Sequence, residues 1–138
     1  MKRNATAVWN GTGKEGSGHL TTQSTAISNT QYSWGSRFAE GVGTNPEELI
    51  AAAHAGCFTM KVSFMLNAEG FTADELKTRC DITLDTAQGA ITKSELTLTG
   101  KVPNIDAAKF SEIANKAKAE CIVSKVLNVE TTLEASLA

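Results

Sequence analysis

Three cysteines are the residues of this 138-residue chain with the clearest potential for chemistry. Cys57, Cys80 and Cys121 are widely spaced and odd in number, which is a poor pattern for the disulfide framework of a secreted protein. In a reducing compartment such residues are either small buried hydrophobes or reactive thiols. The sequence pattern around each cysteine therefore indicates which of these two roles it has.

The three cysteines lie in different sequence patterns. Cys80 falls on the apolar side of an alternating segment, and we interpret it as structural. Cys57 lies midway along an apolar segment beside Gly56, where a core role and a reactive role both fit. Cys121 continues the apolar stripe of a later helix and should point toward the core. If Cys57 and Cys121 meet, the expected chemistry is a thiol–disulfide cycle in which one thiolate attacks and the second resolves.

Histidine offers a second chemistry. His54 stands three residues before Cys57, and this spacing permits a Cys-His hydrolase. Both side chains would lie on one rigid helix with no third group in view to orient the imidazole, which weakens that alternative. The chain has only one other histidine and no Cys-x-x-Cys pair, so we expect neither a zinc site nor a cofactor.

The element around the first cysteine is the clearest in the sequence. Asn45 is a favourable N-cap, Pro46 suits the first helical position, and Glu48 stands where a capping box requires it. The pattern predicts a helix over residues 45–67 that stops at Gly70. Its interior is apolar on nearly every side, so we expect a central helix enclosed by other structure. The lysine and histidine inside it make a membrane span the poorer interpretation.

The remaining segments predict an α+β fold. The expected elements are weak strands over 4–9 and 17–28, a loop over 29–44, half-buried strands over 76–85 and 91–102 joined by a hairpin, a helix over 106–119, and a strand over 126–137. The order ββ–α–ββ–α–β favours antiparallel strands. Because there is no linker or internal repeat, we expect a single domain over 1–138. Arg37, between Trp34 and Phe38 in the long loop, is either a surface residue or part of a pocket.

Composition excludes several classes of partner. Hydrophobic residues make up 41% of the chain, charged residues 20%, and the net charge is -2. No basic stripe is present, so we expect no nucleic-acid partner. The N-terminal MKRNATAVWNG has two basic residues but no apolar run behind them, which does not fit a signal peptide. We therefore expect a cytoplasmic protein without a membrane partner.

Two segments resemble the motifs of one known family. GTNPEELIAAAHAGCF, residues 43–58, resembles the signature of the OsmC/Ohr family of thiol peroxidases. KAKAECIVSKVL, residues 116–127, resembles the second cysteine motif of that family. The likeness extends in order and spacing along essentially the whole chain. The histidine of the first motif, and the position of Arg37 ten residues before Glu47, look more like the OsmC branch than the Ohr branch.

The resemblance implies a role for each matching residue. Cys57 matches the peroxidatic cysteine and Cys121 the resolving cysteine. Arg37 matches the arginine that activates the attacking thiolate, and Glu47 matches the acid that holds this arginine in place. One position departs from the family, because Ile122 stands where a proline usually follows the second cysteine. Proline would fix the start of a helical turn, so we expect the placement of Cys121 to be looser here.

The resemblance also implies a function. The expected activity is the cofactor-free reduction of organic hydroperoxides, and more weakly of hydrogen peroxide, to alcohols. It would run through a Cys57 sulfenic acid and a Cys57–Cys121 disulfide, with a dithiol as reductant, of which the lipoyl type is one candidate. Defence against oxidative or osmotic stress follows as the expected role. The alternative is a redox sensor that reacts without turnover, or a ligand-binding protein that uses the same pocket.

The family fold is an intertwined dimer in which antiparallel sheets wrap long central helices. An all-round apolar helix agrees with such a dimer, because one small domain can hardly cover it alone. Ten residues separate Glu47 from Cys57, which corresponds to about 15 Å along a helix. We therefore expect a homodimer with composite active sites, in which Arg37 and Glu47 of one chain meet Cys57 and Cys121 of the other.

Overall fold

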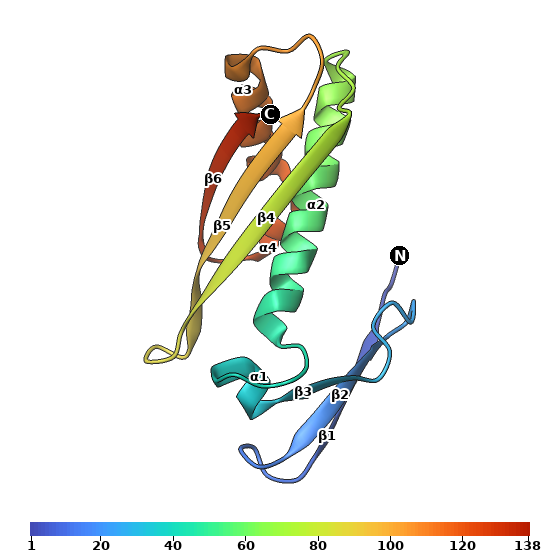
Figure 1. Cartoon of the computed structure of the whole chain (residues 1–138), viewed down its shortest axis with the longest axis vertical. Coiled ribbons are helices and arrows are strands. Elements are labelled where there is room, and N and C mark those ends of the chain that lie inside the picture. Colours follow the sequence, from blue (N-terminus) through green and yellow to red (C-terminus); the bar gives the residue numbers. More distant parts are fainter. The chain divides into compact units, whose positions relative to one another are not determined.

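A computed structural model describes residues 1–138 of the chain and contains both helices and sheets. Two three-stranded sheets are present, which confirms the α+β class. The chain divides into two compact units, Met1–Leu49 and Ile50–Ala138. Figure 1 shows the helices and strands of the two units. The expectation of one domain over 1–138 stays a prediction.

The first unit is built on a small antiparallel sheet. Strands β1 (Ala5–Asn10), β2 (Ser17–Thr22) and β3 (Thr30–Ser33) pair in sequence order. A short helix, α1 (Trp34–Phe38), follows β3 directly. The prediction of a loop over 29–44 is therefore wrong for the segment that forms β3 and α1, because both elements are too short to give a periodic pattern in the sequence.

Local turn chemistry explains two further boundaries. Strand β2 ends at Thr22, earlier than expected, because Thr25 and Asn29 take the positive φ values 61° and 52° that turn the chain. Helix α1 begins after Ser33, which forms a capping box with Ser36: each side chain accepts a hydrogen bond from the backbone N–H of the other. These contacts fix the backbone conformation at the turn after β2 and at the start of α1.

The long helix α2 spans Pro46–Ala68, close to the predicted bounds. The Asn45 side chain accepts a hydrogen bond from the Glu48 backbone N–H at 2.9 Å, as an N-cap should. The Glu48 carboxylate accepts a hydrogen bond from the Thr44 hydroxyl, which gives it a different partner from the one in a capping box. Gly70, with φ of 85°, follows the helix as expected.

Helix α2 has one buried side and one exposed side, although both are largely apolar. The side chains on the buried side follow one another at intervals of four residues: His54, Phe58, Val62 and Leu66. The opposite side carries small or apolar exposed residues: Ala53, Gly56, Met60 and Phe64. The expectation of an enclosed helix is thus met on one side only, and the second unit by itself leaves an apolar stripe uncovered.

By length and composition alone, α2 could also cross a membrane. Its most apolar window has a mean hydropathy of 1.5, and 22% of that window is buried. The central helix of a soluble protein can have the same length and composition. Because the buried side of α2 packs into the core of the second unit, the observation adds little support for a membrane span.

The second unit has a three-stranded sheet of mixed direction. Strands β4 (Glu75–Asp85) and β5 (Ala90–Lys101) form the predicted antiparallel hairpin. Strand β6 (Glu130–Leu137) pairs with β5 in parallel, so the expectation of antiparallel strands is wrong there. The helices α3 (Ala107–Glu120) and α4 (Ile122–Val126) lie between β5 and β6 in the sequence. Such a crossover returns the chain to the end of the sheet from which β5 started, as parallel pairing requires.

One predicted boundary changes around α4. The final strand was expected over 126–137, but it starts at Glu130 because residues 122–126 form a helical turn instead. The predicted inward stripe of α3 is confirmed, and all of its members are buried: Phe110, Ile113, Ala114 and Ala117. These residues pack with the buried side of α2 and with Leu96 and Leu98 of β5. Figure 1 shows α2 and α3 running beside this sheet.

A glycine in β5 has a clear packing reason. A Cβ atom at Gly100 would lie 2.5 Å from the ring of Phe110, so the aromatic side chain of α3 packs directly against the backbone of the strand. Phe110 is 1% exposed. This close approach fixes α3 against the sheet and, with it, the position of the residue that ends α3.

Candidate functional site

Cys57 and Cys121 lie in contact within the second unit. Their sulfur atoms are 3.2 Å apart, within hydrogen-bonding distance for sulfur, and both are free thiols. Cys57 lies in the middle of α2 and is half-buried, whereas Cys121 is only 1% exposed. The two cysteines are 64 positions apart in the sequence, with the β4–β5 hairpin and α3 between them, so tertiary packing alone brings the two thiols together.

The inward stripe of α3 explains the position of Cys121. The residue lies one turn beyond the buried Ala117, on the same side of the helix. It is both the C-cap of α3 and the N-cap of α4, with an extended backbone at φ of −62° and ψ of 128°. The chain therefore breaks between two helices at this cysteine. The break turns its sulfur toward α2.

A small cavity of about 160 Å³ adjoins the two thiols. Its lining residues are Cys57, Met60, Lys61, Phe64, Glu120, Cys121 and Ile122. Apart from the ion pair of Lys61 with Glu120 at 2.8 Å, these residues are apolar or thiols. A small organic molecule can therefore reach the sulfur atoms while its apolar part contacts side chains of α2 and α4.

The surroundings of Cys121 favour its thiolate. Burial raises the pKa of this thiol, but hydrogen bonds outweigh burial and hold the pKa below its ordinary value. The donors are the Ser124 backbone N–H, the Cys57 thiol, the Ser124 hydroxyl and the Val123 backbone N–H. The contact between the two sulfurs can run in either direction, with the Cys121 thiol or the Cys57 thiol as the donor.

Cys80 belongs to a separate buried cluster, with no second sulfur in contact. Its sulfur lies 3.4 Å from the Ser94 hydroxyl and 3.9 Å from His54 Nδ1. Burial raises the pKa of Cys80, the Ser94 hydrogen bond lowers it by less, and the charge of Asp81 adds to the rise. Cys80 therefore stays a protonated thiol, which agrees with a structural role.

His54 is fully buried and hydrogen-bonded through both ring nitrogens. Nδ1 lies 2.7 Å from the Ser94 hydroxyl, and Nε2 lies 2.7 Å from the Ser124 hydroxyl. Burial lowers the pKa of His54, so the imidazole is neutral. Since neither nitrogen is directed at Cys57, the arrangement of a Cys-His hydrolase is not present.

The two serines bound to His54 were missed by sequence reasoning. Ser94 carried a usable signal, because it occupies an inward position of β5 in line with Leu96 and Leu98, where a polar residue needs a partner. Ser124 lies between the helix predicted over 106–119 and the strand predicted over 126–137, so no periodic pattern marks it as an inward position. No group of three or more His, Cys, Asp or Glu side chains is arranged to hold a metal ion.

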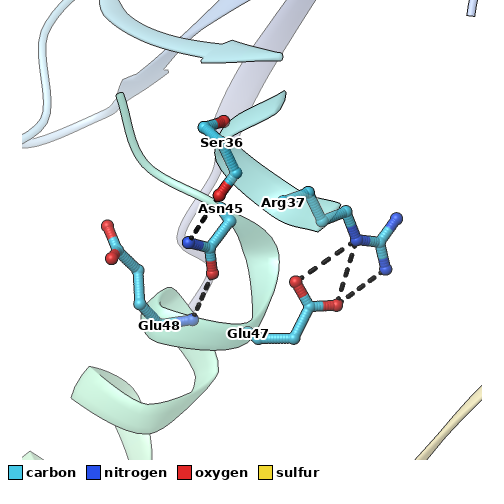
Figure 2. A network of polar contacts seen from close by, with 5 residues as sticks. All are labelled: Ser36, Arg37, Asn45, Glu47 and Glu48. Atoms are coloured by element: carbon cyan, nitrogen blue, oxygen red, sulfur yellow. Dashed lines mark hydrogen bonds and ion pairs between the residues drawn. The ribbon is translucent and has the colours of Figure 1, made fainter. Parts of the chain in front are cut away.

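Arg37 and Glu47 meet within the first unit. Arg37 Nη2 donates to Glu47 Oε1 at 2.7 Å, and Arg37 Nε lies 3.1 and 3.2 Å from the two carboxylate oxygens (Figure 2). This forked pairing fixes the plane of the guanidinium group. The Glu47 side chain is 12% exposed and that of Arg37 is 40% exposed. The carboxylate therefore orients the arginine while one side of the guanidinium stays accessible.

A network of hydrogen bonds holds α1 beside the start of α2. The Asn45 side-chain amide donates to the Ser36 carbonyl at 3.1 Å (Figure 2). The Ser36 hydroxyl donates to the Thr44 carbonyl at 2.8 Å. Gly43 adopts a φ of 111° where the chain passes Gln31, an approach too close for a Cβ atom. These contacts position Arg37 on α1 opposite Glu47 in the first turn of α2.

An α+β fold that carries two thiols in contact beside a small apolar cavity defines a thiol-dependent redox protein. Comparison with known proteins narrows this class. The sequence pattern of the family OsmC, described as OsmC-like protein, matches residues 39–136. The chain is 46% identical to the peroxiredoxin OsmC of Escherichia coli over 133 residues, covering 95% of this chain and 93% of that protein.

Two further relatives agree with this match. The organic hydroperoxide resistance protein OhrB of Bacillus subtilis is 32% identical over 95 residues, or 67% of this chain and 69% of that protein. Its crystal structure superposes with a TM-score of 0.70, covering 96% of this chain and 98% of that one. An OsmC-like protein from Mycoplasma pneumoniae shares the fold, with a TM-score of 0.78 at 15% identity over 100% and 98% of the chains.

The chain belongs to the OsmC family. It is an enzyme, a peroxiredoxin-like thiol peroxidase, with a redox role in peroxide detoxification. The resemblance seen in the two cysteine motifs is thereby confirmed at the level of the family.

Proposed function

We propose that this protein reduces organic hydroperoxides by a two-cysteine cycle in which Cys57 attacks and Cys121 resolves. The single observation that carries the proposal is the 3.2 Å contact between the two sulfur atoms. Access supports this division of roles, because Cys57 is half-buried beside a cavity whereas Cys121 is almost fully buried. A peroxide approaching through the cavity reaches Cys57 more easily.

The cycle has three balanced steps. The Cys57 thiolate attacks the terminal oxygen of the hydroperoxide; the O–O bond breaks, the S–O bond forms, and the alkoxide takes up a proton to leave as the alcohol. The Cys121 thiolate then attacks the Cys57 sulfenic acid; the S–S bond forms, and hydroxide leaves and is protonated to water. Finally an external dithiol exchanges with the disulfide, becomes oxidised itself, and restores both thiols.

For this cycle to start, the negative charge of the thiolate must lie on Cys57 and not on Cys121. Hydrogen-bond donors at Cys121 favour the thiolate there, yet the first step requires it on Cys57. A cation beside Cys57 would shift the charge, and Arg37 is the residue that the family resemblance assigns to this task. The Glu47 carboxylate keeps the guanidinium oriented through both of its oxygens.

The cavity supports a preference for organic peroxides. Met60, Phe64 and Ile122 are well exposed apolar residues in its lining. Burying about 100 Å² of apolar surface of a bulky peroxide would contribute roughly 2.5 kcal/mol, or on the order of fifty-fold to a hundredfold in efficiency. Hydrogen peroxide has no apolar surface to bury, so it should be the poorer substrate.

The uncovered side of α2 supports a homodimer. Ala53, Gly56, Met60 and Phe64 form an exposed apolar stripe. An adjoining groove of about 830 Å³ runs between α2 and the start of β4. A second copy of the long helix can cover such a stripe by two-fold pairing. Antiparallel pairing of two α2 helices would bring the first turn of one beside the middle of the other, so that Arg37 and Glu47 act on the partner's thiols.

The setting of the reaction follows from the same chemistry. Thiols that must return to the reduced state after each turnover fit the cytoplasm, where reductants maintain them. The reductant in the proposal is a dithiol, with the lipoyl type as one candidate, and the role is defence against oxidative or osmotic stress. No cofactor takes part in any of the three steps.

The test of the proposal is repeated turnover. Peroxide consumption is followed with cumene hydroperoxide or hydrogen peroxide in the presence of a regenerating dithiol, either dihydrolipoamide or dithiothreitol. We expect many peroxides to be reduced per chain, with the organic peroxide used more efficiently. One peroxide consumed per chain would favour the alternative of a redox sensor. Equal efficiencies for the two peroxides would contradict the role of the apolar cavity.

The composite site has its own test. An inactive Cys57→Ser chain and an Arg37→Ala chain are mixed, unfolded and refolded together. In heterodimers a site shared between chains gains one intact Arg37 beside one intact Cys57, so activity should return. Chains carrying tags of different size would reveal whether heterodimers form. Heterodimers without activity would show that each site belongs to one chain.

A further inference from the structure

Helix α4, which follows Cys121, is held to the rest of its unit by few contacts. None of its residues is fully buried, and Ile122 and Val126 are 76% and 75% exposed. Ile122 also lacks the fixed φ angle that a proline would give the first helical position. The polar side-chain link from α4 to the interior is the 2.7 Å hydrogen bond between Ser124 and the buried His54.

This link bears directly on the position of the Cys121 sulfur. Cys121 is the N-cap of α4, so Ser124 lies on the first turn that it caps. Hydrogen bonding by Ser124 and by the Val123 backbone lowers the pKa of Cys121. Because Ser124 and Cys121 belong to the same helical turn, whatever fixes Ser124 also bears on the position of the Cys121 sulfur. On α2, His54 stands three residues before Cys57, so one rigid helix carries both Cys57 and the group that holds its partner.

The hydrogen bonds around His54 form a continuous chain. A neutral imidazole has one N–H donor and one acceptor nitrogen. In one consistent arrangement Nδ1 accepts from the Ser94 hydroxyl, while Nε2–H donates to Ser124. The Ser124 hydroxyl is then free to donate its own proton to Cys121. This arrangement leaves no buried polar side-chain atom without a partner.

We propose that His54 is a positioning residue for the resolving step: acting through Ser124, it holds α4 so that Cys121 faces Cys57 and closes the disulfide promptly after the sulfenic acid forms. This inference rests on the proposed two-cysteine cycle. In the closing step the Cys121 thiolate attacks the sulfenic sulfur, the S–O bond breaks, and hydroxide leaves and is protonated to water. When α4 is not held, the sulfenic acid persists and a second peroxide oxidises it to the sulfinic acid.

The other tie near Cys121 is weaker. Lys61 of α2 pairs with Glu120 at the end of α3 at 2.8 Å, but the two side chains are 32% and 42% exposed. An exposed ion pair of this kind contributes little. The His54–Ser124 bond has one fully buried partner and one half-buried partner, so solvent screens it less and it should dominate the placement of Cys121.

The experiment separates the two oxidation steps. The full chain is mixed rapidly with cumene hydroperoxide without reductant; dimedone labelling follows sulfenic acid formation, and mass spectrometry follows disulfide closure. In Ser124→Ala and His54→Gln the first step should stay within about twofold of the unmodified protein. The second should slow at least tenfold, and sulfinic acid at Cys57 should accumulate with excess peroxide.

Two matched variants complete the design. Ser124→Thr keeps the hydroxyl and should restore fast closure, which a purely structural loss would not do. Ser111→Ala removes a hydroxyl of α3 that contacts only Asn115, and both steps should be unchanged. If His54→Gln fails to fold, the half-buried Ser124→Ala decides the matter. Unchanged closure in Ser124→Ala would overturn the inference, whereas absence of the first step in the unmodified protein would instead overturn the proposed cycle.

Discussion

The two sides of the His54 imidazole present similar groups in different settings. On each side a ring nitrogen lies 2.7 Å from a serine hydroxyl, and beyond each serine is a cysteine. Ser94 leads to Cys80, whose pKa burial raises. Ser124 leads to Cys121, whose pKa its hydrogen bonds lower despite burial.

The difference shows that a serine partner by itself does not lower the pKa of a thiol below its ordinary value. Cys80 has only that hydroxyl to set against burial and the nearby charge of Asp81. Cys121 caps a helical turn, where backbone N–H groups face its sulfur, and it touches a second thiol. The pKa of each cysteine thus depends on the backbone donors and on the neighbouring sulfur as well as on its serine partner.

The largest expected effect comes from removing Cys57, the thiol in contact with Cys121. Replacing Cys57 by serine removes the attacking thiolate, so peroxide consumption should fall to the uncatalysed background. The measurement is the steady-state rate with cumene hydroperoxide and a dithiol, with circular dichroism to establish that the variant is folded. A folded Cys57→Ser protein that retains substantial turnover would mean that Cys121 is the attacking residue.

The next effect separates attack from resolution. In Cys121→Ser the first oxidation of Cys57 should proceed, because the cavity and the attacking thiol remain. No second sulfur is available to close a disulfide, so a sulfenic acid should persist and be captured by dimedone as a single labelled cysteine. Normal multiple turnover in this variant, with no added thiol able to resolve the intermediate, would exclude a resolving role.

A smaller effect tests the charge that starts the cycle. Arg37→Lys keeps a positive charge but loses the forked pairing with Glu47, and Glu47→Gln leaves the arginine with a neutral partner. The second-order rate of Cys57 oxidation should fall about tenfold to a hundredfold in each, as expected for a lost charge-assisted interaction of roughly 1.5–3 kcal/mol. Disulfide closure should not change. An unchanged oxidation rate in both variants would remove the pair from the mechanism.

The smallest effect concerns Cys80, which lies on the Ser94 side of the His54 imidazole. Cys80→Ala should leave peroxide reduction within about twofold, because no step uses this thiol. Its free energy of unfolding should fall by about 1 kcal/mol, the usual scale of a small core change, as measured by denaturant titration. A large loss of activity without a matching loss of stability would show that Cys80, like Cys121, takes part in the reaction.

Periodic segments of this molecule could be read from the sequence, whereas short capped ones could not. Helix α2, the β4–β5 hairpin and the inward stripe of α3 repeat their pattern over ten or more residues, so their type was predictable. Helices α1 and α4 have five residues each and depend on Ser33 and Cys121 as caps. The parallel direction of β6 follows from the crossover through α3 and α4, which no local pattern records.

The candidate site was predictable in part for a related reason. The α3 stripe indicated that Cys121 points inward, and the family motifs implied the roles of the two cysteines and of Arg37 with Glu47. The hydrogen bonds of His54 depend on Ser94 and Ser124, which are 40 and 70 residues away in the sequence. Contacts of such range arise only when the sheet and helices pack, so the His54–Ser124 link required the structure.

The most direct test of the account is to map the disulfide formed by the reduced protein. The chain is treated with one equivalent of cumene hydroperoxide, excess thiol is blocked by alkylation, and the digested peptides are identified by mass spectrometry. The contact between Cys57 and Cys121 predicts a single dominant link between these two residues, with Cys80 recovered as the alkylated free thiol. A dominant link that includes Cys80, or complete consumption of the peroxide with all three cysteines recovered as alkylated thiols, would contradict the two-cysteine mechanism.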